Sequence, residues 1–232
     1  MGAMRSIDVG SALAVSVFRV GSGLIVGKLG PRPTEPVTLW DFEGCPYSQI
    51  VREALTELDL EAHVLPCPIR GKRYRADLRA RGGGVPFLVD PGDGSALYGA
   101  PVIVRHLFAR YGAGKAPARL LVPPHVTPLA AATSWLRGRW LGRYARPSRK
   151  PDRPLELWSF EASPYCRIAR EALTSLEIPY LLHNVGKRSP SRPAFVARSG
   201  KMQVPYLVDP NTGQSMFESA EIVAYLERTY GA

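Results

Sequence analysis

The chain has 232 residues, a formal net charge of +10 and only three cysteines. A chain of this length can hold two small domains, each with a modest hydrophobic core. An odd and irregularly spaced set of cysteines argues against a disulfide-stapled secreted scaffold. It favours a reducing compartment, so we expect a cytoplasmic protein.

The N-terminal region is apolar between residues 11 and 29, but it is interrupted by Arg19 and Lys28. A membrane-spanning helix needs ~20 mostly uncharged apolar residues, so we expect no membrane span. A secretory signal is not favoured either, because no clear cleavage site follows the apolar run. We predict instead a helical lead-in segment with a proline-rich end, which together cover residues 1–36.

Residues 37–112 have the pattern of one small α/β domain. Val37 begins a β-rich run, and Pro46 stands where the first position of a helix tolerates proline, so Cys45 is predicted to cap that helix. Asp, Pro and Gly residues after position 90 predict a hairpin turn. The predicted order is βαβαββα, with strands at 37–42, 62–65, 86–90 and 96–98, helices after Pro46 and at 100–111, and a short helix or loop at 74–81.

The second half of the chain repeats the first. Residues 39–58 laid over residues 157–176 give 13 identities in 20 positions, at a constant shift of 118. A repeat longer than 100 residues indicates two domains rather than a solenoid of short units. We therefore predict a second domain of the same topology at 155–232, joined to the first by a segment at 113–154 that contains a helix.

The joining segment is basic, with nine Lys or Arg residues and one acid between positions 115 and 153. One interpretation is a site for a polyanion or a membrane surface. The other is a solvated face whose arginines pair with either domain. We favour the second, because no nucleic-acid-binding module accompanies the charge, and we expect no nucleic-acid partner.

Both domains carry a tetrad at the start of the first helix, but they place the cysteine differently. The first has Cys45-Pro46-Tyr47-Ser48 and the second has Ser163-Pro164-Tyr165-Cys166. A cysteine at a helix N-terminus is stabilised as a thiolate by the helix dipole and by free backbone N–H groups. Cys45 is therefore a candidate nucleophile toward disulfides, and a small packed residue without turnover is the alternative. No metal site is predicted.

The element order, the tetrads and two Val-Pro pairs resemble the thioredoxin-like domain of glutaredoxins and of the N-terminal half of glutathione transferases. The strongest match is the segment 218–226, which looks like the Glu-Ser-x-x-Ile-x-x-Tyr-Leu segment of glutathione transferases. The resemblance covers the chain twice from about Val37 onward. It implies an α/β fold of two tandem thioredoxin-like domains without the all-helical C-terminal domain, and glutathione as ligand or cosubstrate.

The resemblance also implies roles for the two Val-Pro pairs. Pro86 and Pro205 would be cis prolines, and Val85 and Val204 would pair with the cysteinyl part of glutathione. A plain turn that leads into a strand is the alternative.

The two domains differ where the resemblance places the γ-glutamyl end of glutathione. The second domain has Glu218 and Ser219 there, whereas the first has Gly99 and Ala100, whose side chains offer neither charge nor donor. Lys187 is a candidate partner for the glycine carboxylate of glutathione, with a merely solvated lysine as the alternative.

Three further residues are candidates with open alternatives. By resemblance, the Ser163 hydroxyl would donate to the glutathione sulfur, but a serine also fills a helix N-cap without any chemical role. Cys166 stands one helical turn further on, at the resolving position. Cys67 follows the second strand and could emerge near Cys45 as a resolving thiol. A buried or loop cysteine is the favoured interpretation of Cys67.

Arg52 and Glu53 recur as Arg170 and Glu171 on the first helix of each domain. Adjacent residues on a helix do not face each other, so we expect these side chains to bond elsewhere, within their own domain or across the domain interface.

These observations support three hypotheses about function. The first is glutathione-dependent thiol–disulfide or thiol-transfer chemistry on an unidentified substrate. The second is a non-catalytic glutathione- or peptide-binding module, or an assembly module, built from a duplicated domain. The third gives the basic segment a polyanion or membrane partner. Fold alone does not choose among them.

Overall fold

The computed structural model describes residues 22–122 and 142–232. The predicted lead-in helices around Val17 and Trp135 lie outside these ranges. Among the residues that are described, no helix is both long enough and apolar enough to cross a membrane.

Both halves have the predicted order βαβαββα. The first half contains β1 (Val37–Asp41), α2 (Pro46–Glu57), β2 (Ala62–Pro66), α3 (Arg75–Ala80), β3 (Phe87–Asp90), β4 (Ser95–Tyr98), α4 (Ala100–Tyr111) and a short α5 (Ala118–Leu121). The second contains β5 (Leu155–Ser159), α7 (Pro164–Ser175), β6 (Tyr180–Asn184), α8 (Arg192–Ser199), β7 (Tyr206–Asp209), β8 (Gln214–Phe217) and α9 (Ser219–Tyr230).

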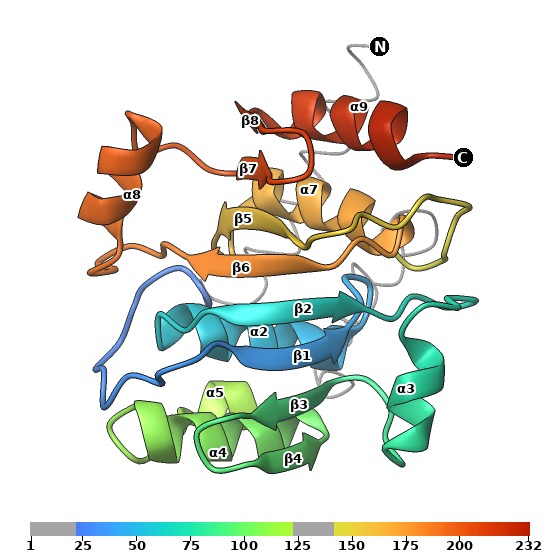
Figure 1. Cartoon of the computed structure of the whole chain (residues 1–232). Coiled ribbons are helices and arrows are strands. Elements are labelled where there is room, and N and C mark those ends of the chain that lie inside the picture. Colours follow the sequence, from blue (N-terminus) through green and yellow to red (C-terminus); the bar gives the residue numbers. More distant parts are fainter. Residues whose placement is uncertain (1–21, 123–141) are drawn as a thin grey trace.

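The strands of the two halves form one continuous sheet in the order β4-β3-β1-β2-β6-β5-β7-β8 (Figure 1). The halves join where β2 pairs with β6 in antiparallel fashion, with His63 opposite Leu181. These two residues are related by the same shift of 118 that relates the repeats, so a pseudo-twofold axis passes through this pair. Because β1 is parallel to β2 and β5 to β6, the strands of the two halves run in opposite directions.

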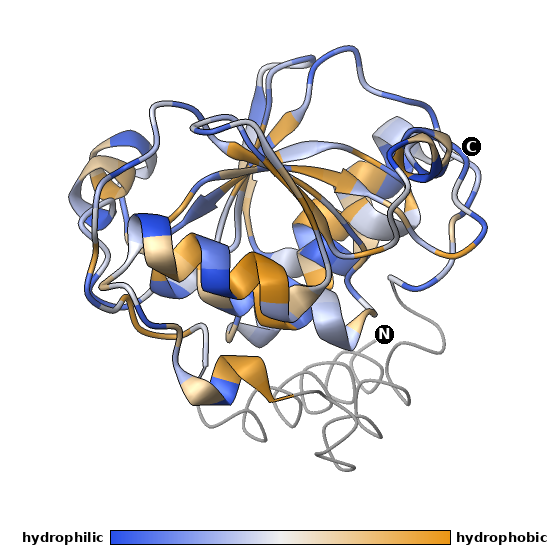
Figure 2. Cartoon of the chain, turned by 90° about the horizontal axis from the view of Figure 1, so that it is seen from below, coloured by the Kyte–Doolittle hydropathy of each residue, from blue (hydrophilic) through white to orange (hydrophobic). Residues whose placement is uncertain are grey.

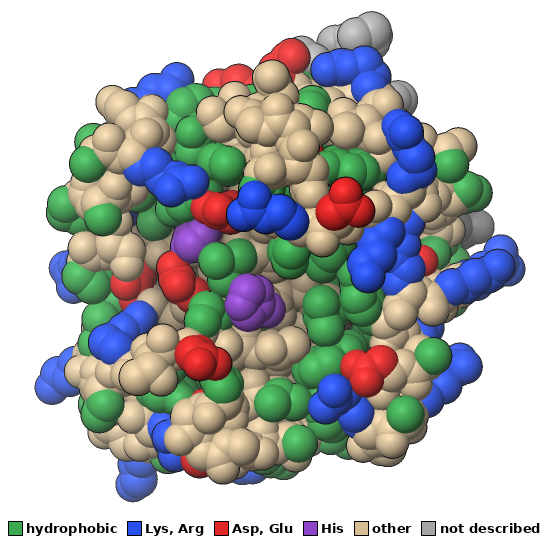
Figure 3. Space-filling model, in the orientation of Figure 1, with side chains coloured by type: hydrophobic (Ala, Val, Ile, Leu, Met, Phe, Trp, Pro, Cys, Tyr) green, Lys and Arg blue, Asp and Glu red, His purple; other side chains and the backbone are tan. Residues whose placement is uncertain are grey.

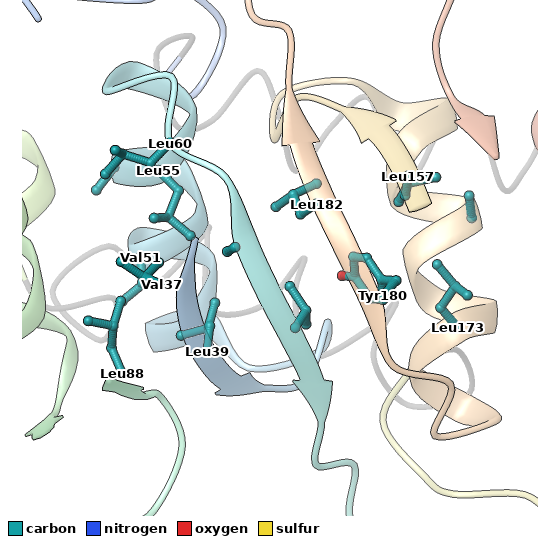
Figure 4. Close-up of a cluster of buried hydrophobic side chains, with 14 of the residues drawn as sticks. Val37, Leu39, Val51, Leu55, Leu60, Leu88, Leu157, Leu173, Tyr180 and Leu182 are labelled. Carbon is teal, nitrogen blue, oxygen red and sulfur yellow. The ribbon is translucent and has the colours of Figure 1, made fainter. Parts of the chain in front are cut away.

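The main hydrophobic core lies between the sheet and the helices α2, α4, α7 and α9, which cover one face (Figure 1). Figure 2 shows hydrophobic residues concentrated where these helices meet the sheet. In Figure 4, Leu39 and Leu182 from the central strands lie between Leu55 of α2 and Leu173 of α7. This main core therefore continues across the boundary between the halves, whereas each half also has a smaller cluster of its own, around Trp40 and around Trp158.

Buried charges connect the halves on the helical side of the sheet. The Arg52 Nε atom of α2 donates to Glu161 of the second half at 3.0 Å, and the Arg170 Nε atom of α7 donates to Glu43 of the first half at 2.9 Å. The two bonds are equivalent under the repeat. The expectation that these arginines bond away from their helical neighbours is confirmed, and both bond across the interface.

The electrostatics of this interface favour the ionised state of Glu43. Burial alone would raise its pKa, but the charges of Arg170, Arg52 and Arg167 outweigh burial and lower the pKa from 4.5 to about 2. Nearby Asp41 also pairs with Arg52, yet its pKa is raised, because burial outweighs that pairing. A carboxyl whose pKa falls on folding stabilises the fold above its unfolded-state pKa. For Glu43 that stabilisation is lost as the pH falls from about 4.5 toward 2.

Arginines of the segment between the halves pair with both of them. Arg119 pairs with Glu57 of α2 at 2.6 Å, Arg146 pairs with Glu227 of α9, and Arg149 donates to the carbonyl oxygen of Thr229 at 2.5 Å. These contacts fit the interpretation of the basic segment as a surface whose arginines bind the protein itself.

We predict that Glu43→Gln lowers the free energy of unfolding by about 3 kcal/mol at pH 7, since it leaves a buried arginine without part of its counter-charge. Urea unfolding followed by circular dichroism measures this change. The variant should also lose less stability than the parent between pH 4.5 and pH 2, because it lacks the carboxyl whose pKa is lowered.

The matched control is Glu221→Gln on the exposed side of α9, which should change stability by less than about 0.5 kcal/mol. Equal effects of the two substitutions would show that the buried ion pairs between the halves stabilise the fold no more than an exposed carboxylate does.

Candidate functional site

Cys45 caps the first helix of the first domain, as the sequence predicts. Its Sγ atom accepts a hydrogen bond from the backbone N–H of Ser48 at 3.4 Å, and Pro46 follows in the first turn. The residue is 7% exposed, and the neighbouring Tyr47 is exposed. The thiol therefore lies just below the surface at a helix N-terminus.

Ser163 has the same position in the second domain. Its Oγ atom accepts from the backbone N–H of Cys166 at 3.2 Å, which is the geometry of a helix N-cap. This contact accounts for Ser163 as a helix cap.

Both Val-Pro pairs lie beside the tetrads and contain cis peptide bonds, at Val85–Pro86 and Val204–Pro205. The strands explain the proximity. In the second domain β7 starts where antiparallel β5 ends, with Trp158 opposite Tyr206, so the loop before α7 and the Val204–Pro205 turn meet at one end of the sheet. The first domain repeats this arrangement with Trp40 opposite Phe87.

The end of β8 brings Glu218 to the same place, because Phe217 pairs with Tyr206 directly after the cis proline. Glu218 is exposed, has a positive φ of 63° and accepts a hydrogen bond from the side-chain amide of Gln203 at 2.5 Å. Ser219 follows as the first residue of α9 and is 8% exposed. Gln203 is a candidate site residue that the sequence analysis missed.

A signal for Gln203 was present in the repeat. Gln203 directly precedes Val204, and the first domain has Gly84 in its place. Gly99, with φ of 89°, replaces Glu218. Both members of the hydrogen-bonded pair are therefore replaced by glycine in the first domain, so that domain lacks both polar side chains.

Cys67 and Cys166 are buried thiols. Cys67 is 0% exposed, packs with Trp40, Leu78 and Phe87, and has a pKa raised by burial to about 12. Cys166 is also 0% exposed, and burial raises its pKa. All three cysteines are free. Neither buried thiol forms a thiolate readily near neutral pH.

Segments that precede each domain cross to the other domain's tetrad. The backbone N–H of Ala162, next to Ser163, donates to the carbonyl oxygen of Gly23 at 3.1 Å. Equivalently, Gly44 next to Cys45 lies against Arg143, and a Cβ atom at this glycine would be 3.5 Å from that of Arg143. Each tetrad loop is therefore covered on one side by chain from the other half.

Lys187 is exposed after β6, at the same end of the sheet as Ser163. Its backbone is held by the crossing segment: its N–H donates to Leu24 at 2.7 Å, and its carbonyl accepts from Val26 at 2.8 Å. The side chain is thus presented to solvent from a fixed backbone position.

The two tetrads lie at opposite ends of the sheet. Strand β1, which leads to Cys45, is parallel to β2, whereas β5, which leads to Ser163, is parallel to β6. Because β2 and β6 are antiparallel, their carboxyl ends point in opposite directions. Cys45 and the Gln203–Glu218 pair therefore cannot hold the same small molecule within one chain.

A group with metal-ligating atoms lies away from both tetrads. Atoms of Asp90, Asp93 and His106 that could ligate a metal lie within 4.8 Å of one another. The group already has partners: Arg110 pairs with both carboxylates, and Tyr111 donates to Asp90 at 2.7 Å. Both carboxylates therefore have partners within the protein.

The element order, a helix-capping Cys or Ser, and a cis proline before the third strand define a thioredoxin-like domain, present twice. A family model described as the N-terminal domain of glutathione S-transferase matches residues 39–116 and 157–232. These matches cover more than half of the chain, which therefore belongs to this family and carries its domain in tandem. No all-helical domain accompanies them within the described ranges.

Searches of curated proteins and of solved structures gave no match to this chain.

We predict that iodoacetamide at pH 8 alkylates Cys45 in the native protein at least 100-fold faster than Cys67 or Cys166. A thiol with a pKa of about 12 is roughly 10⁻⁴ ionised at that pH, and both slow thiols are shielded from solvent. Peptide mass spectrometry over time measures the three rates. Equal labelling of Cys67 and Cys45 would show that burial does not control their reactivity.

Proposed function

We propose that the second domain binds glutathione and that the first domain carries out thiol–disulfide exchange with Cys45. The observation that supports this proposal is that each domain has the functional groups that the other domain lacks. The first domain has the capping thiol but glycine at positions 84 and 99, and the second has the Gln203–Glu218 pair but a serine cap.

In the second domain, glutathione would lie across the end of β7. The γ-glutamyl ammonium group would pair with Glu218, whose side chain is already oriented by Gln203, and the α-carboxylate would accept from Ser219 at the start of α9. The backbone of Val204 would pair with the cysteinyl residue. Ser163 would donate its hydroxyl hydrogen to the glutathione sulfur, and Lys187 would meet the glycine carboxylate.

In the first domain, the Cys45 thiolate would attack the glutathione-side sulfur of a mixed disulfide held along Val85–Pro86. A Cys45–glutathione disulfide forms, and the second sulfur leaves as a thiolate that takes up a proton. A second glutathione thiolate then attacks this disulfide, releases oxidised glutathione and restores the Cys45 thiolate. The cycle consumes one mixed disulfide and one reduced glutathione.

This cycle requires no second protein thiol. Ser48 stands where a second cysteine of the tetrad would be, and the burial of Cys67 keeps that thiol protonated. We therefore propose a one-thiol mechanism and assign neither Cys67 nor Cys166 the attacking role.

We predict that Glu218→Gln weakens glutathione binding by roughly 10- to 100-fold, because the ammonium group loses its charged partner, an interaction of about 1.5–3 kcal/mol. Isothermal titration calorimetry with reduced glutathione measures the change, and Glu221→Gln on the following helix α9 is the matched control. Unchanged affinity in Glu218→Gln would remove Glu218 from the site.

We predict that Cys45→Ser lowers the glutathione-dependent reduction of hydroxyethyl disulfide by at least 100-fold, since a hydroxyl does not replace the thiolate as nucleophile. The activity should persist in Glu218→Gln, because the two sites lie at opposite ends of the sheet. A parent protein without exchange activity and without glutathione affinity would favour a non-catalytic module built from the duplicated domain.

A further inference from the structure

A basic surface lies beside Cys45 and is formed by both halves of the chain. The segment that precedes β5 crosses here to the loop after β2. The backbone N–H of Ile69 donates to the carbonyl oxygen of Arg143 at 2.7 Å, and the N–H of Ala145 donates to the carbonyl oxygen of Ile69 at 2.9 Å. These two bonds hold the backbone of Arg143 and Tyr144 against the first domain.

The crossing segment places Arg143 directly beside the first tetrad. A Cβ atom at Gly44, the residue before Cys45, would lie 3.5 Å from the Cβ atom of Arg143. The next residue of the crossing segment, Tyr144, is 39% exposed, and Tyr47 of the tetrad is 38% exposed. The surface around the capping thiol therefore contains two exposed tyrosines and an arginine.

Arg70 contributes a second guanidinium to this surface. Its guanidinium carbon lies 5.7 Å from the centroid of the Tyr144 ring, and that of Arg143 lies 5.8 Å from the same centroid. Both distances are typical of a cation–π contact. Two like charges at one ring repel each other, and a bound anion relieves that repulsion. The backbone φ of Arg70 is 66°, the same as that of its counterpart Arg188 in the second domain.

Both guanidiniums are available to another molecule. Within the described part of the chain, the side chains of Arg70 and Arg143 donate to no carboxylate or carbonyl oxygen. Arg73 and Arg75 of the same loop differ, because their side chains donate to backbone carbonyl oxygens. In Figure 3, Lys and Arg side chains lie along the right-hand side of the view, where β1 and β2 end in Figure 1.

Comparison with the second domain shows that one cation has changed position. The backbone bond from Lys187 to Leu24 is the counterpart of the bond from Ile69 to Arg143. The second domain therefore has a cation on the loop after β6 and an aliphatic residue on the crossing segment, whereas the first domain has the reverse. A positive charge is kept at this place in both domains although a different residue carries it. This compensation favours a role in binding an anion.

We propose that Arg70, Arg143 and Tyr144 form an anion-binding subsite that selects disulfide substrates with a carboxylate group near the reacting sulfur. A carboxylate accepts two parallel hydrogen bonds from one guanidinium, which fixes its orientation as well as its charge. The subsite rests on the proposed function, because Cys45 is its nucleophile. The first domain has glycine at positions 84 and 99, so charge beside the thiol selects the substrate there and a γ-glutamyl group is not required.

Three disulfides of matched length test the subsite without glutathione. Dithiodipropionate ends in carboxylates, hydroxyethyl disulfide in hydroxyls and cystamine in ammonium groups. The Cys45 thiolate attacks one sulfur, a protein mixed disulfide forms, and the other sulfur leaves as a thiolate that takes up a proton. Peptide mass spectrometry of the full chain at pH 8 and low salt measures the three rates at Cys45. The same rates with N-acetylcysteine amide, a neutral thiol, correct for the intrinsic reactivity of each disulfide.

After this correction, we expect Cys45 to react with dithiodipropionate roughly fivefold faster than with hydroxyethyl disulfide and slowest with cystamine, because two exposed cations contribute. Equal corrected rates with the three disulfides would overturn the proposal. A preference for dithiodipropionate in a protein without glutathione-dependent turnover would support the subsite and contradict the proposed catalytic cycle.

Two variants and a control locate the preference. Arg143→Leu, which introduces the residue type of the second domain, should reduce the preference for dithiodipropionate by roughly threefold, whereas Arg143→Lys, which keeps the charge, should retain most of it. The rate with hydroxyethyl disulfide should not change. Arg228→Leu removes the same charge from an exposed position on α9 and is the matched control. An equal loss in Arg143→Leu and Arg228→Leu would overturn the proposal, because net charge alone would then explain the preference.

Discussion

Arg52 and Arg170 are almost completely shielded from water, and each pairs with carboxylates of its own half and of the other half. A buried cation that loses part of its counter-charge costs several kcal/mol, so the carboxylate from the other half helps to hold each first helix in this environment. The partners, Glu161 and Glu43, lie two residues before the capping Ser163 and Cys45. The ion pairs that join the halves therefore also fix the loops that lead to both tetrads.

The ion pairs between the halves explain why the two domains are alike at their interface and differ elsewhere. The positions on the pseudo-twofold interface keep their residue types, as Arg52 and Arg170 do, because a change in one half would leave a buried charge in the other. Residues at the outer ends of the sheet are free of that constraint. There the domains diverge, with Cys45 opposite Ser163 in the alignment, and glycine opposite Gln203 and Glu218.

Much of the fold followed from local patterns. The cap at Cys45, the proline after it and the hairpin turn after Asp90 are each decided within a few residues, and the structure has the predicted element order in both halves. Candidate site residues in the second domain also followed from short motifs. Gln203 was missed because a polar residue before a Val-Pro pair has no local signature, and its role depends on Glu218 fifteen positions later.

The sequence by itself determined the duplication, the two thioredoxin-like domains and the division of the cysteines, because these depend on residue identity and short-range periodicity. Only the tertiary structure decided how the domains join. Strand β2 pairs with β6, and Arg52 and Arg170 form ion pairs with the opposite half. These contacts connect residues more than 100 positions apart, and no local pattern encodes such a contact. That antiparallel junction places the two tetrads at opposite ends of the sheet.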